Sequence, residues 1–314
     1  MLHVSVLIAS FNAAHCIADA IASVQAQSVR ELEVLVIDDA STDETAAIVA
    51  SHAERDPRIR LLRAPVNRGP GVARNLGLEA ARGEWIAILD ADDRFHPERL
   101  ARLLALAAHH GADIVADNLH LCPDGRASEA VMLPPEWVAK DKHLNAEEFV
   151  LGNISDGART RRGYGYLKPL IRRGFLERAR LRYAPARFAE DYLFFLDCLL
   201  HGAYWILTPT AMYDYAVAAG SGTACHDAAD LEYLMLRERA LLETADRLGE
   251  ARLCKLMRRH LRSVGLALAW FRFAEALKHR DPAAAVAELS RDPRTTIHIL
   301  REGLRAVPRL LARV

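Results

Sequence analysis

The chain of 314 residues contains no C-x-x-C pair, and its five cysteines are scattered along the sequence. An odd number of isolated cysteines argues against a disulfide framework and against a paired-cysteine zinc or redox motif. Aromatic residues make up only 7% of the chain, and basic residues are not interleaved with them in a patch that would bind nucleic acid. Reduced thiols in a cytosolic protein fit this composition best.

No apolar run reaches the roughly 18 residues that a bilayer-spanning helix requires. The longest candidate, Gly265 to Leu277, is interrupted by Arg272 and Glu275. The first residues, Met1 to Ile8, have no basic segment before their apolar residues and are typical of a strand rather than a signal peptide. We therefore expect a protein on the cytosolic side of the membrane.

The sequence also lacks a dinucleotide fingerprint, because G-x-G-x-x-G follows neither the first apolar run nor any later one. This absence argues against a nicotinamide dehydrogenase. The segment Asn67 to Gly77 does contain glycines, which permit close backbone approach. It opens a predicted helix, and a helix N-terminus favours anions.

Apolar runs and amphipathic segments alternate over the first third of the chain, which predicts a mostly parallel, doubly wound α/β sheet flanked by helices. After about Asp227 the chain is expected to be helical. The expected strands are Val4–Ala9, Leu32–Ile37, Ile59–Leu62, Trp85–Leu89, Asp113–Ala116 and Tyr204–Thr208, and the expected helices Ala14–Gln27, Thr42–Arg55, Val72–Ala81, Pro97–His110 and Glu190–His201.

The tetrapeptide Asp90-Ala91-Asp92-Asp93 follows directly on the strand Trp85–Leu89. Three carboxylates crowded at the end of a buried strand repel one another unless a cation neutralises them, and hard oxygen ligands suit Mg²⁺ or Mn²⁺. Ligands of open α/β sheets bind at this edge of the sheet. For the tetrapeptide alone, an acidic surface loop without a ligand is an equal alternative.

A second acidic pair, Asp38-Asp39, lies at the end of the strand Leu32–Ile37. Parallel strands are buried on both faces, so these carboxylates belong at the mouth of the strand, where one could accept a nucleobase N–H. Helix capping by Asp39 or Ser41 is the alternative. The first strand opens into Ser10-Phe11-Asn12, where the aromatic ring could cover a base and the backbone could approach a ribose.

These segments occur in the order found in family 2 glycosyltransferases, which the sequence resembles. The family has the GT-A fold, a nucleotide-binding α/β domain with a metal-binding D-x-D motif. Later segments extend the resemblance over some two-thirds of the chain. They are Gly165–Arg173, Phe188–Phe195, Tyr213–Tyr215 and Gly220–Thr223.

The resemblance implies a role for each donor-side residue. Asp39 would accept the N3–H of uracil, Asp38 would support that pocket, and Ser10, Phe11 and Asn12 would complete the nucleotide site.

At the next strand, Asp92 would bind the divalent metal, while Asp90 would face the ribose or the metal's water shell. Asp93 would be a supporting carboxylate. Arg74 would steady either the acidic cluster or a phosphate.

The acceptor side rests on Asp191, which the resemblance identifies as the general base; the alternative is an ordinary acidic first turn of a helix. His226 would complete the metal shell, as a late histidine does in some GT-A enzymes. An exposed loop histidine is the simpler interpretation.

The whole pattern predicts an inverting, metal-dependent glycosyltransferase. It resembles the bacterial exopolysaccharide branch that includes succinoglycan-type glucosyltransferases, which implies UDP-glucose as donor and a lipid-linked oligosaccharide as acceptor. Residues 1–226 would form the catalytic domain, with a nucleotide-binding half (1–100) and an acceptor-binding half (101–226), and 227–314 a helical extension. A sugar-phosphate nucleotidyltransferase and a non-catalytic nucleotide-sugar-binding module are the alternatives; the first lacks support, because no glycine-rich loop with arginine follows the first strand.

The last segment of the chain is basic. Residues Ala251 to Val314 hold 14 Lys/Arg against 5 Asp/Glu, a local charge of +9 within a neutral chain. Apolar residues from Leu253 to Phe271 fall on one helical stripe with the basic residues largely off it. Packing inside the protein and contact with an anionic membrane surface are both open for this stripe. The segment Arg301 to Arg313 repeats the basic-apolar mixture.

Overall fold

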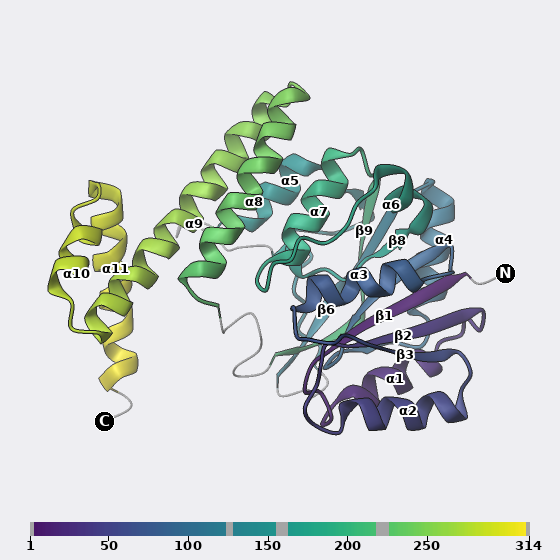
Figure 1. Ribbon diagram of the computed structural model, residues 1–314. Helices are drawn as coiled ribbons and strands as arrows, with labels where there is room; N and C mark the ends of the chain where they lie inside the picture. Colours follow the sequence, from purple (N-terminus) through teal and green to yellow (C-terminus); the bar gives the residue numbers. More distant parts are fainter. Residues whose placement is uncertain (1–2, 124–127, 155–162, 218–225, 312–314) are drawn as a thin grey trace. The chain divides into compact units, whose positions relative to one another are not determined.

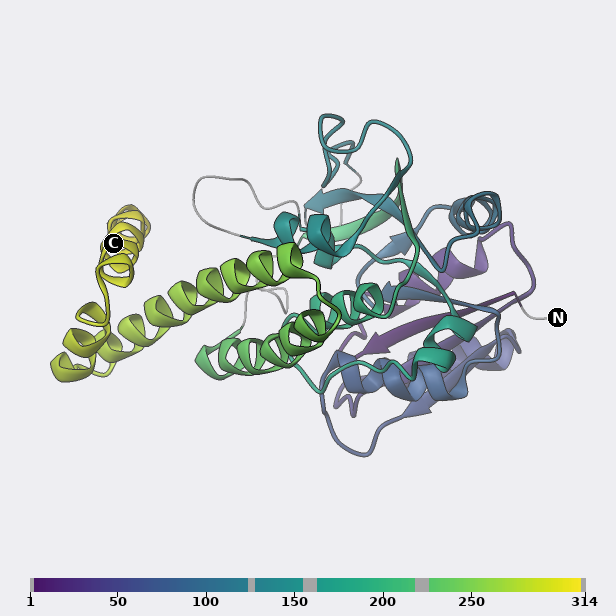
Figure 2. The same ribbon diagram turned by 90° about the horizontal axis from the view of Figure 1, so that it is seen from above.

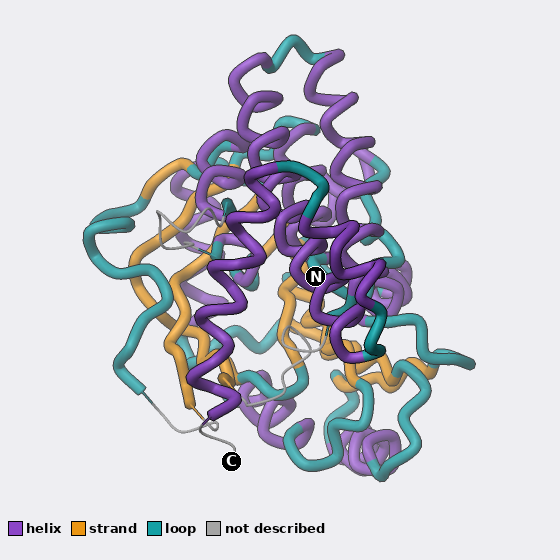
Figure 3. Tube along the Cα trace, turned by 90° about the vertical axis from the view of Figure 1, so that its left-hand side faces the viewer, coloured by secondary structure: helices purple, strands orange, loops and turns teal. Residues whose placement is uncertain are grey.

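The computed structural model describes residues 3–123, 128–154, 163–217 and 226–311. The chain divides into two compact units (Figure 1). One comprises Met1–Asn153 and Arg161–Ala224, and the other Ile154–Thr160 and Cys225–Val314. Every described strand belongs to the first unit, whereas the second is formed by helices (Figure 3).

The first unit contains one nine-stranded sheet with the order β3-β2-β1-β4-β8-β6-β9-β5, and β7 pairs with β9. The strands are β1 (Val4–Ser10), β2 (Leu32–Asp38), β3 (Ile59–Arg63), β4 (Trp85–Asp90), β5 (Arg94–Phe95), β6 (Ile114–Pro123), β7 (Lys142–His143), β8 (Leu170–Arg172) and β9 (Trp205–Val217). The helices are α1 (Ile17–Gln25), α2 (Thr45–Arg55), α3 (Pro70–Ala80), α4 (Arg99–His110), α5 (Ala146–Asn153), the 3₁₀ turn η1 (Tyr164–Tyr166), α6 (Arg173–Ala179) and α7 (Glu190–Leu200).

The first four strands form the parallel part of the sheet. The apolar runs of β1, β2 and β4 are buried because α1 and α2 lie on one face and α3 on the other (Figure 1), whereas the edge strand β3 is only partly buried. The register places Ser10 opposite Asp38 and Ala9 opposite Asp90. The carboxyl ends of β1, β2 and β4 therefore meet at one edge, where the sequence concentrates its acidic residues.

The second half of the sheet is mixed. The short strand β8 runs antiparallel to β4 and β6, and β6 then pairs in parallel with β9. Six strands consequently point one way and only β5, β7 and β8 point the other, which confirms the expected mostly parallel sheet flanked by helices.

The strands β6 and β9 are longer than their apolar patterns predict. The expected strands Asp113–Ala116 and Tyr204–Thr208 continue to Pro123 and Val217, through a register shift near Asn118. Polar residues interrupt the apolar pattern there. Asp117 is fully buried nevertheless, because Arg99 donates to its Oδ1 from Nε (3.1 Å) and Nη2 (2.6 Å).

The second unit contains α8 (Ala228–Arg247), α9 (Ala251–Lys278), α10 (Pro282–Leu289) and α11 (Pro293–Leu311). The long helices α8 and α9 lie side by side as a hairpin (Figures 1 and 2), and α9 also contacts α10 and α11. The apolar stripe of α9 is largely buried, at Leu253, Met257, Leu261, Val264 and Leu268. This stripe therefore serves packing, and the membrane interpretation does not apply to it. Among the described helices, none combines the length and apolarity that a bilayer crossing needs.

The buried Arg99–Asp117 pair predicts a large stability effect. The carboxylate of Asp117 pairs with Arg99 and also accepts the N–H of Met212 (3.2 Å). In Asp117→Asn the neutral amide cannot balance the charge of Arg99, which is then left buried and uncompensated. We expect the free energy of unfolding, measured with urea, to fall by about 3–5 kcal/mol. The matched change Glu84→Gln, in the exposed pair with Arg172, should cost less than about 1 kcal/mol. Equal losses would contradict this assignment.

Candidate active site

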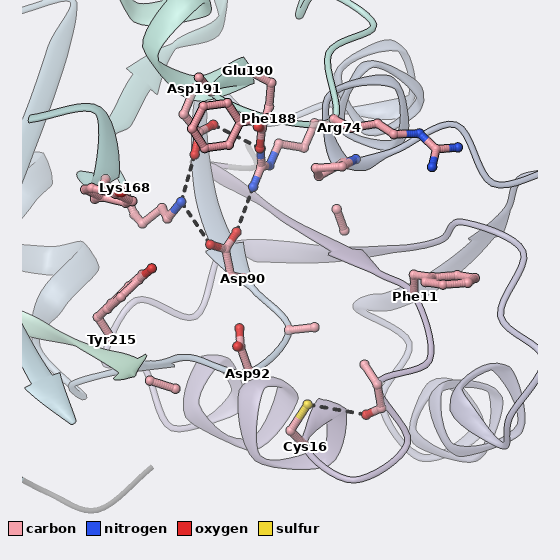
Figure 4. Close-up of a pocket in the computed structure, with 18 of the residues that line it drawn as sticks. Phe11, Cys16, Arg74, Asp90, Asp92, Lys168, Phe188, Glu190, Asp191 and Tyr215 are labelled. Carbon is pink, nitrogen blue, oxygen red and sulfur yellow. Dashed lines mark hydrogen bonds and ion pairs between the residues drawn. The ribbon is translucent and has the colours of Figure 1, made fainter. Parts of the chain in front are cut away.

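A pocket of about 350 Å³ opens at the carboxyl ends of β1 and β4 (Figure 4). Its walls come from segments far apart in the sequence, and all of them belong to the first unit. The lining residues that carry the argument are Phe11, Arg74, Asp90, Asp92, Lys168 and Asp191.

Arg74 is the centre of the polar side of this pocket. Its Nη2 donates to Oδ1 of Asp90 (2.7 Å), and its Nη1 donates to Oε1 of Glu190 (2.8 Å) and Oδ1 of Asp191 (2.9 Å). The guanidinium is almost fully buried. A single side chain of α3 thus holds carboxylates from β4 and α7.

Lys168 is the second buried cation. Its Nζ lies 2.9 Å from Oδ2 of Asp90 and 2.8 Å from Oδ2 of Asp191. Two positive and three negative side chains leave the cluster with a charge of −1, and Lys168 and Arg74 approach Asp90 and Asp191 from different sides (Figure 4). We call Arg74, Lys168, Asp90, Glu190 and Asp191 the ion cluster.

Local structure explains how these side chains reach one point. Asp90 ends β4, and Asp191 is the second residue of α7, a helix that begins directly after Ala189, whose backbone is left-handed (φ 57°). Gly71 lets α3 approach the chain before α7, since a Cβ there would lie 2.8 Å from the carbonyl oxygen of Ala184. The close approach brings Arg74, one turn further along α3, to the carboxylates of α7.

The ion cluster shifts the proton affinities of its members. Burial opposes ionisation of Asp90, but the charges of Lys168 and Arg74 outweigh it and lower the pKa of Asp90 to about 2. Burial and the neighbouring charge of Asp191 raise the pKa of Glu190. Burial alone would lower the pKa of Lys168, yet Asp191 and Asp90 hold that pKa well above its ordinary value.

Asp92 and Asp93 differ in their surroundings. Asp93 is buried, where its Oδ2 accepts from the Tyr213 hydroxyl (2.6 Å) and its Oδ1 from the N–H of Ala216 (2.7 Å). Asp92 is exposed to the pocket, and its carboxylate accepts a hydrogen bond from its own backbone N–H but forms no ion pair with a described residue. Loss of hydration and the charge of Asp90 raise the pKa of Asp92.

These donors would suit a divalent cation that takes most of its ligands from elsewhere than the protein. In the part of the chain that is described, no three acidic, histidine or cysteine side chains are arranged so that they could hold a metal ion by themselves. Both oxygens of Asp90 are already paired with cations, so Asp92 is the carboxylate available to a metal. Mg²⁺ commonly binds through one or two carboxylates and completes its shell with substrate phosphates and water.

The predicted base-binding residues lie beside this pocket. Phe11 lines it and is 49% exposed. Asn12 lines it too, and its Oδ1 accepts the N–H of Thr42 (2.9 Å), tying the loops after β1 and β2 together. Ser10 is buried, with its hydroxyl 3.3 Å from the Ile37 carbonyl oxygen.

The acidic pair of β2 is nearly inaccessible. Oδ1 of Asp38 accepts the N–H of Ser41 (3.1 Å), and its Oδ2 lies 3.4 Å from Nε of Arg63. Oδ2 of Asp39 accepts the N–H of Gly69 (2.8 Å), and Arg68 N–H also donates to this carboxylate. Asp39 therefore fixes the loop before α3. Only the remaining lone pairs of its carboxylate are left to accept a hydrogen bond from a nucleobase.

His226 belongs to the second unit, where its ring packs on Phe271 with centroids 5.0 Å apart. Its predicted role as a metal ligand stays a prediction. The Gly220–Thr223 segment lies outside the described residues.

Sequence reasoning did not assign roles to Lys168, Glu190 or Tyr213. A lysine or tyrosine in a mixed segment carries no pattern that separates a buried ion-cluster member from a surface residue. The family resemblance did mark the segments Gly165–Arg173, Phe188–Phe195 and Tyr213–Tyr215, which contain these residues, but it gave a role only to Asp191. The position of Glu190 directly before Asp191 was a further signal, because adjacent carboxylates at a helix start require compensation.

Solved structures place this fold among GT-A glycosyltransferases. Residues 1–349 of TarS from S. aureus match with a TM-score of 0.64 at 16% identity, covering 91% of this chain and 90% of that one. The same protein in complex with UDP-GlcNAc gives a TM-score of 0.62. The mannosyltransferase PcManGT from Pyrobaculum calidifontis, in complex with GDP-Man and Mn²⁺, gives 0.54 at 21% identity, covering 97% of this chain and 80% of that one.

Sequence comparison identifies the family. Residues 5–165 match the model of glycosyl transferase family 2. The succinoglycan biosynthesis protein ExoO of Rhizobium meliloti is 36% identical over 312 residues, 99% of this chain and 87% of that protein. ExoU of the same organism is 34% identical over 262 residues, 83% of this chain and 75% of that protein. The chain belongs to glycosyl transferase family 2 and is a glycosyltransferase, so the nucleotidyltransferase interpretation is set aside.

The ion cluster predicts thermodynamic coupling between Lys168 and Asp191. Lys168→Met should lower the free energy of unfolding by about 3–5 kcal/mol, because it leaves buried carboxylates undercompensated. Adding Asp191→Asn removes one of those charges. The loss in free energy of unfolding of the double variant should therefore be smaller, by about 1–3 kcal/mol, than the sum of the losses of the two single variants.

Urea unfolding of the four proteins in this cycle measures the coupling. The control cycle pairs Lys168→Met with Glu84→Gln, which lies in a separate exposed ion pair and should be additive within about 0.5 kcal/mol. Additivity in both cycles would show that Lys168 and Asp191 do not interact.

Proposed function

We propose that this enzyme is an inverting, divalent-metal-dependent glycosyltransferase that moves a sugar from a nucleoside diphosphate to an acceptor hydroxyl, with Asp191 as general base. One observation carries the proposal: the strand-end carboxylates Asp90 and Asp92 and the distant Asp191 line the same pocket. A leaving diphosphate needs positive charge, and an attacking hydroxyl needs a proton acceptor. The pocket supplies residues suited to both.

In the proposed reaction the acceptor oxygen attacks the anomeric carbon as the bond from that carbon to the phosphate oxygen breaks. The hydroxyl proton passes to Asp191, and the nucleoside diphosphate leaves with the bonding electron pair. Attack opposite the leaving group inverts the anomeric centre, so no carboxylate nucleophile is required. General base catalysis of this kind contributes about 10²–10⁴-fold.

Arg74 and Lys168 orient the base in this scheme. Each oxygen of Asp191 accepts from one of them, which fixes the plane of the carboxylate in the pocket wall. Because both cations also pair with Asp90, they link the position of the base to the strand that carries Asp92. A shift of β4 would therefore also move the carboxylate of Asp191.

On the donor side, Asp92 would hold the metal together with the diphosphate. A bound Mg²⁺ or Mn²⁺ would neutralise charge on the leaving diphosphate. Phe11 would stack on the base, Asp39 would accept the uracil N3–H with Asp38 behind it, and Ser10 and Asn12 would shape the ribose site. Residues 1–100 and 101–226 would then be the donor and acceptor halves of a catalytic domain.

We further propose UDP-glucose as donor and a lipid-linked exopolysaccharide oligosaccharide as acceptor, with the enzyme peripheral on the cytosolic face of the membrane. The names of the ExoO and ExoU relatives, both succinoglycan biosynthesis proteins, support an exopolysaccharide product. A panel of nucleotide sugars tests the donor. UDP-glucose should give the highest kcat/KM, and a preference for a GDP- or dTDP-sugar would contradict the uridine assignment.

Asp191→Asn separates catalysis from binding. We expect turnover, measured as UDP release with acceptor, to fall by about 10²–10⁴-fold, while the calorimetric affinity for UDP with Mg²⁺ is retained. Asp197→Asn makes the same chemical change on the same helix, outside the pocket lining, and should leave turnover intact. Unchanged turnover in Asp191→Asn would refute its role as base and would favour the non-catalytic binding module.

Removal of divalent metal should abolish transfer, and Mg²⁺ or Mn²⁺ should restore it. In Asp92→Asn the metal concentration for half-maximal rate should rise by at least about tenfold, since losing even an outer-sphere partner has an effect of this size. Asp19→Asn, at a surface carboxylate that is 72% exposed, serves as the matched control. Full activity in chelator would overturn metal dependence.

A further inference from the structure

Helix α11 exposes an apolar stripe that the helical unit does not use. Ile297, Leu300 and Leu304 are 66%, 57% and 75% exposed, although their i, i+3, i+7 spacing places them on one side of the helix. Scattered exposed leucines are ordinary, whereas an aligned row of large aliphatic side chains marks an interaction surface.

The opposite side of α11 already makes its packing contacts. Thr295 and Ile299 are 5% and 1% exposed, and Gly303 continues this i, i+4, i+8 row toward the ring of Trp270 on α9. The helix is therefore anchored through one side, and the exposed stripe contributes nothing to the core of the unit.

Two arginines border the exposed stripe. Arg294 and Arg301 are exposed, and neither forms an ion pair with a described residue. At 3.6 residues per turn, these arginines and the three aliphatic residues fall within an arc of about 120°. Of the neighbouring acidic residues, Asp292 caps the helix through Thr295 and lies within electrostatic reach of Arg294 without forming an ion pair with it, and Glu302 falls outside the arc. We name Arg294, Ile297, Leu300, Arg301 and Leu304 the α11 face.

We propose that the α11 face binds an anionic phospholipid surface. Aliphatic side chains enter the boundary between headgroups and acyl chains, and the arginines bind the phosphates above it. A second copy of the chain fits less well, because a two-fold contact between α11 faces would add like charges and offers no carboxylate to the arginines. The local charge of +9 from Ala251 to Val314 favours the same anionic partner.

The inference rests on the proposed function, because a lipid-linked acceptor gives the enzyme a reason to stay at a membrane. Its physical basis is nevertheless separate, since the residues that line the pocket and those of the α11 face share no member. Binding to lipid and sugar transfer can therefore be measured independently.

Sedimentation of the full chain with vesicles tests the α11 face. The wild type should bind phosphatidylglycerol-containing vesicles, bind pure phosphatidylcholine vesicles much more weakly, and lose affinity as salt is raised. Arg294→Glu with Arg301→Glu should weaken binding at least about tenfold, and so should Ile297→Ser with Leu300→Ser and Leu304→Ser.

Matched controls lie on α8 and just after it. Arg237→Glu with Arg239→Glu changes the net charge equally, and Leu236→Ser with Leu248→Ser removes aliphatic side chains that are 61% and 56% exposed. Both should bind vesicles like the wild type. Circular dichroism and thermal unfolding establish that every variant is folded.

Three results would overturn the inference: no binding of the wild type to anionic vesicles, equal losses in face and control variants, or a wild-type dimer that the serine variant converts to monomer. Transfer to a soluble acceptor should keep its wild-type kcat in all these variants. If the protein binds vesicles but turns over no nucleotide sugar, the proposed function is wrong and the role of the α11 face is kept. If it turns over a nucleotide sugar but does not bind vesicles, only the role of the α11 face is rejected.

Discussion

The pocket depends on two buried cations that hold three carboxylates together. Without Arg74 and Lys168, the side chains of Asp90, Glu190 and Asp191 would be concentrated negative charge with little water to screen it. Each cation contacts more than one carboxylate, so neither can move without disturbing the others. The ion cluster thus fixes the relative positions of β4, α3, α7 and the segment before β8.

The same neutralisation defines what the cluster leaves for a substrate. Asp90 is fully paired, and Asp93 is satisfied by Tyr213 and the backbone of Ala216. Asp92, two residues after Asp90, lines the pocket and forms no ion pair with a described cation. A D-x-D sequence therefore does not imply two equivalent carboxylates. Its first member is part of the scaffold of the site, and only its second is free to meet an incoming cation.

The sequence was sufficient for the parallel half of the sheet, because fully buried strands such as Trp85–Leu89 give continuous apolar runs. It was insufficient for β6 and β9, where the buried Asp117 breaks the apolar pattern and is tolerated only through Arg99, 18 residues away. The site shows the same limit. Acidic residues at strand ends predicted the pocket, but the partners of Asp191 are 117 and 23 residues distant and become visible only in three dimensions.

The helical tail shows why amphipathic pattern alone cannot separate packing from surface binding. Both α9 and α11 carry aliphatic rows with basic residues nearby, yet the row of α9 is buried while that of α11 lies in solvent. What distinguishes them is whether another side of the helix already provides its packing contacts. In α11, Thr295, Ile299 and Gly303 do so, which leaves the aliphatic row without a structural purpose inside the unit. An exposed aliphatic row lowers solubility and adds nothing to the core, so its presence on α11 is explained by an external partner. Because Arg294 and Arg301 flank the row, that partner should be anionic.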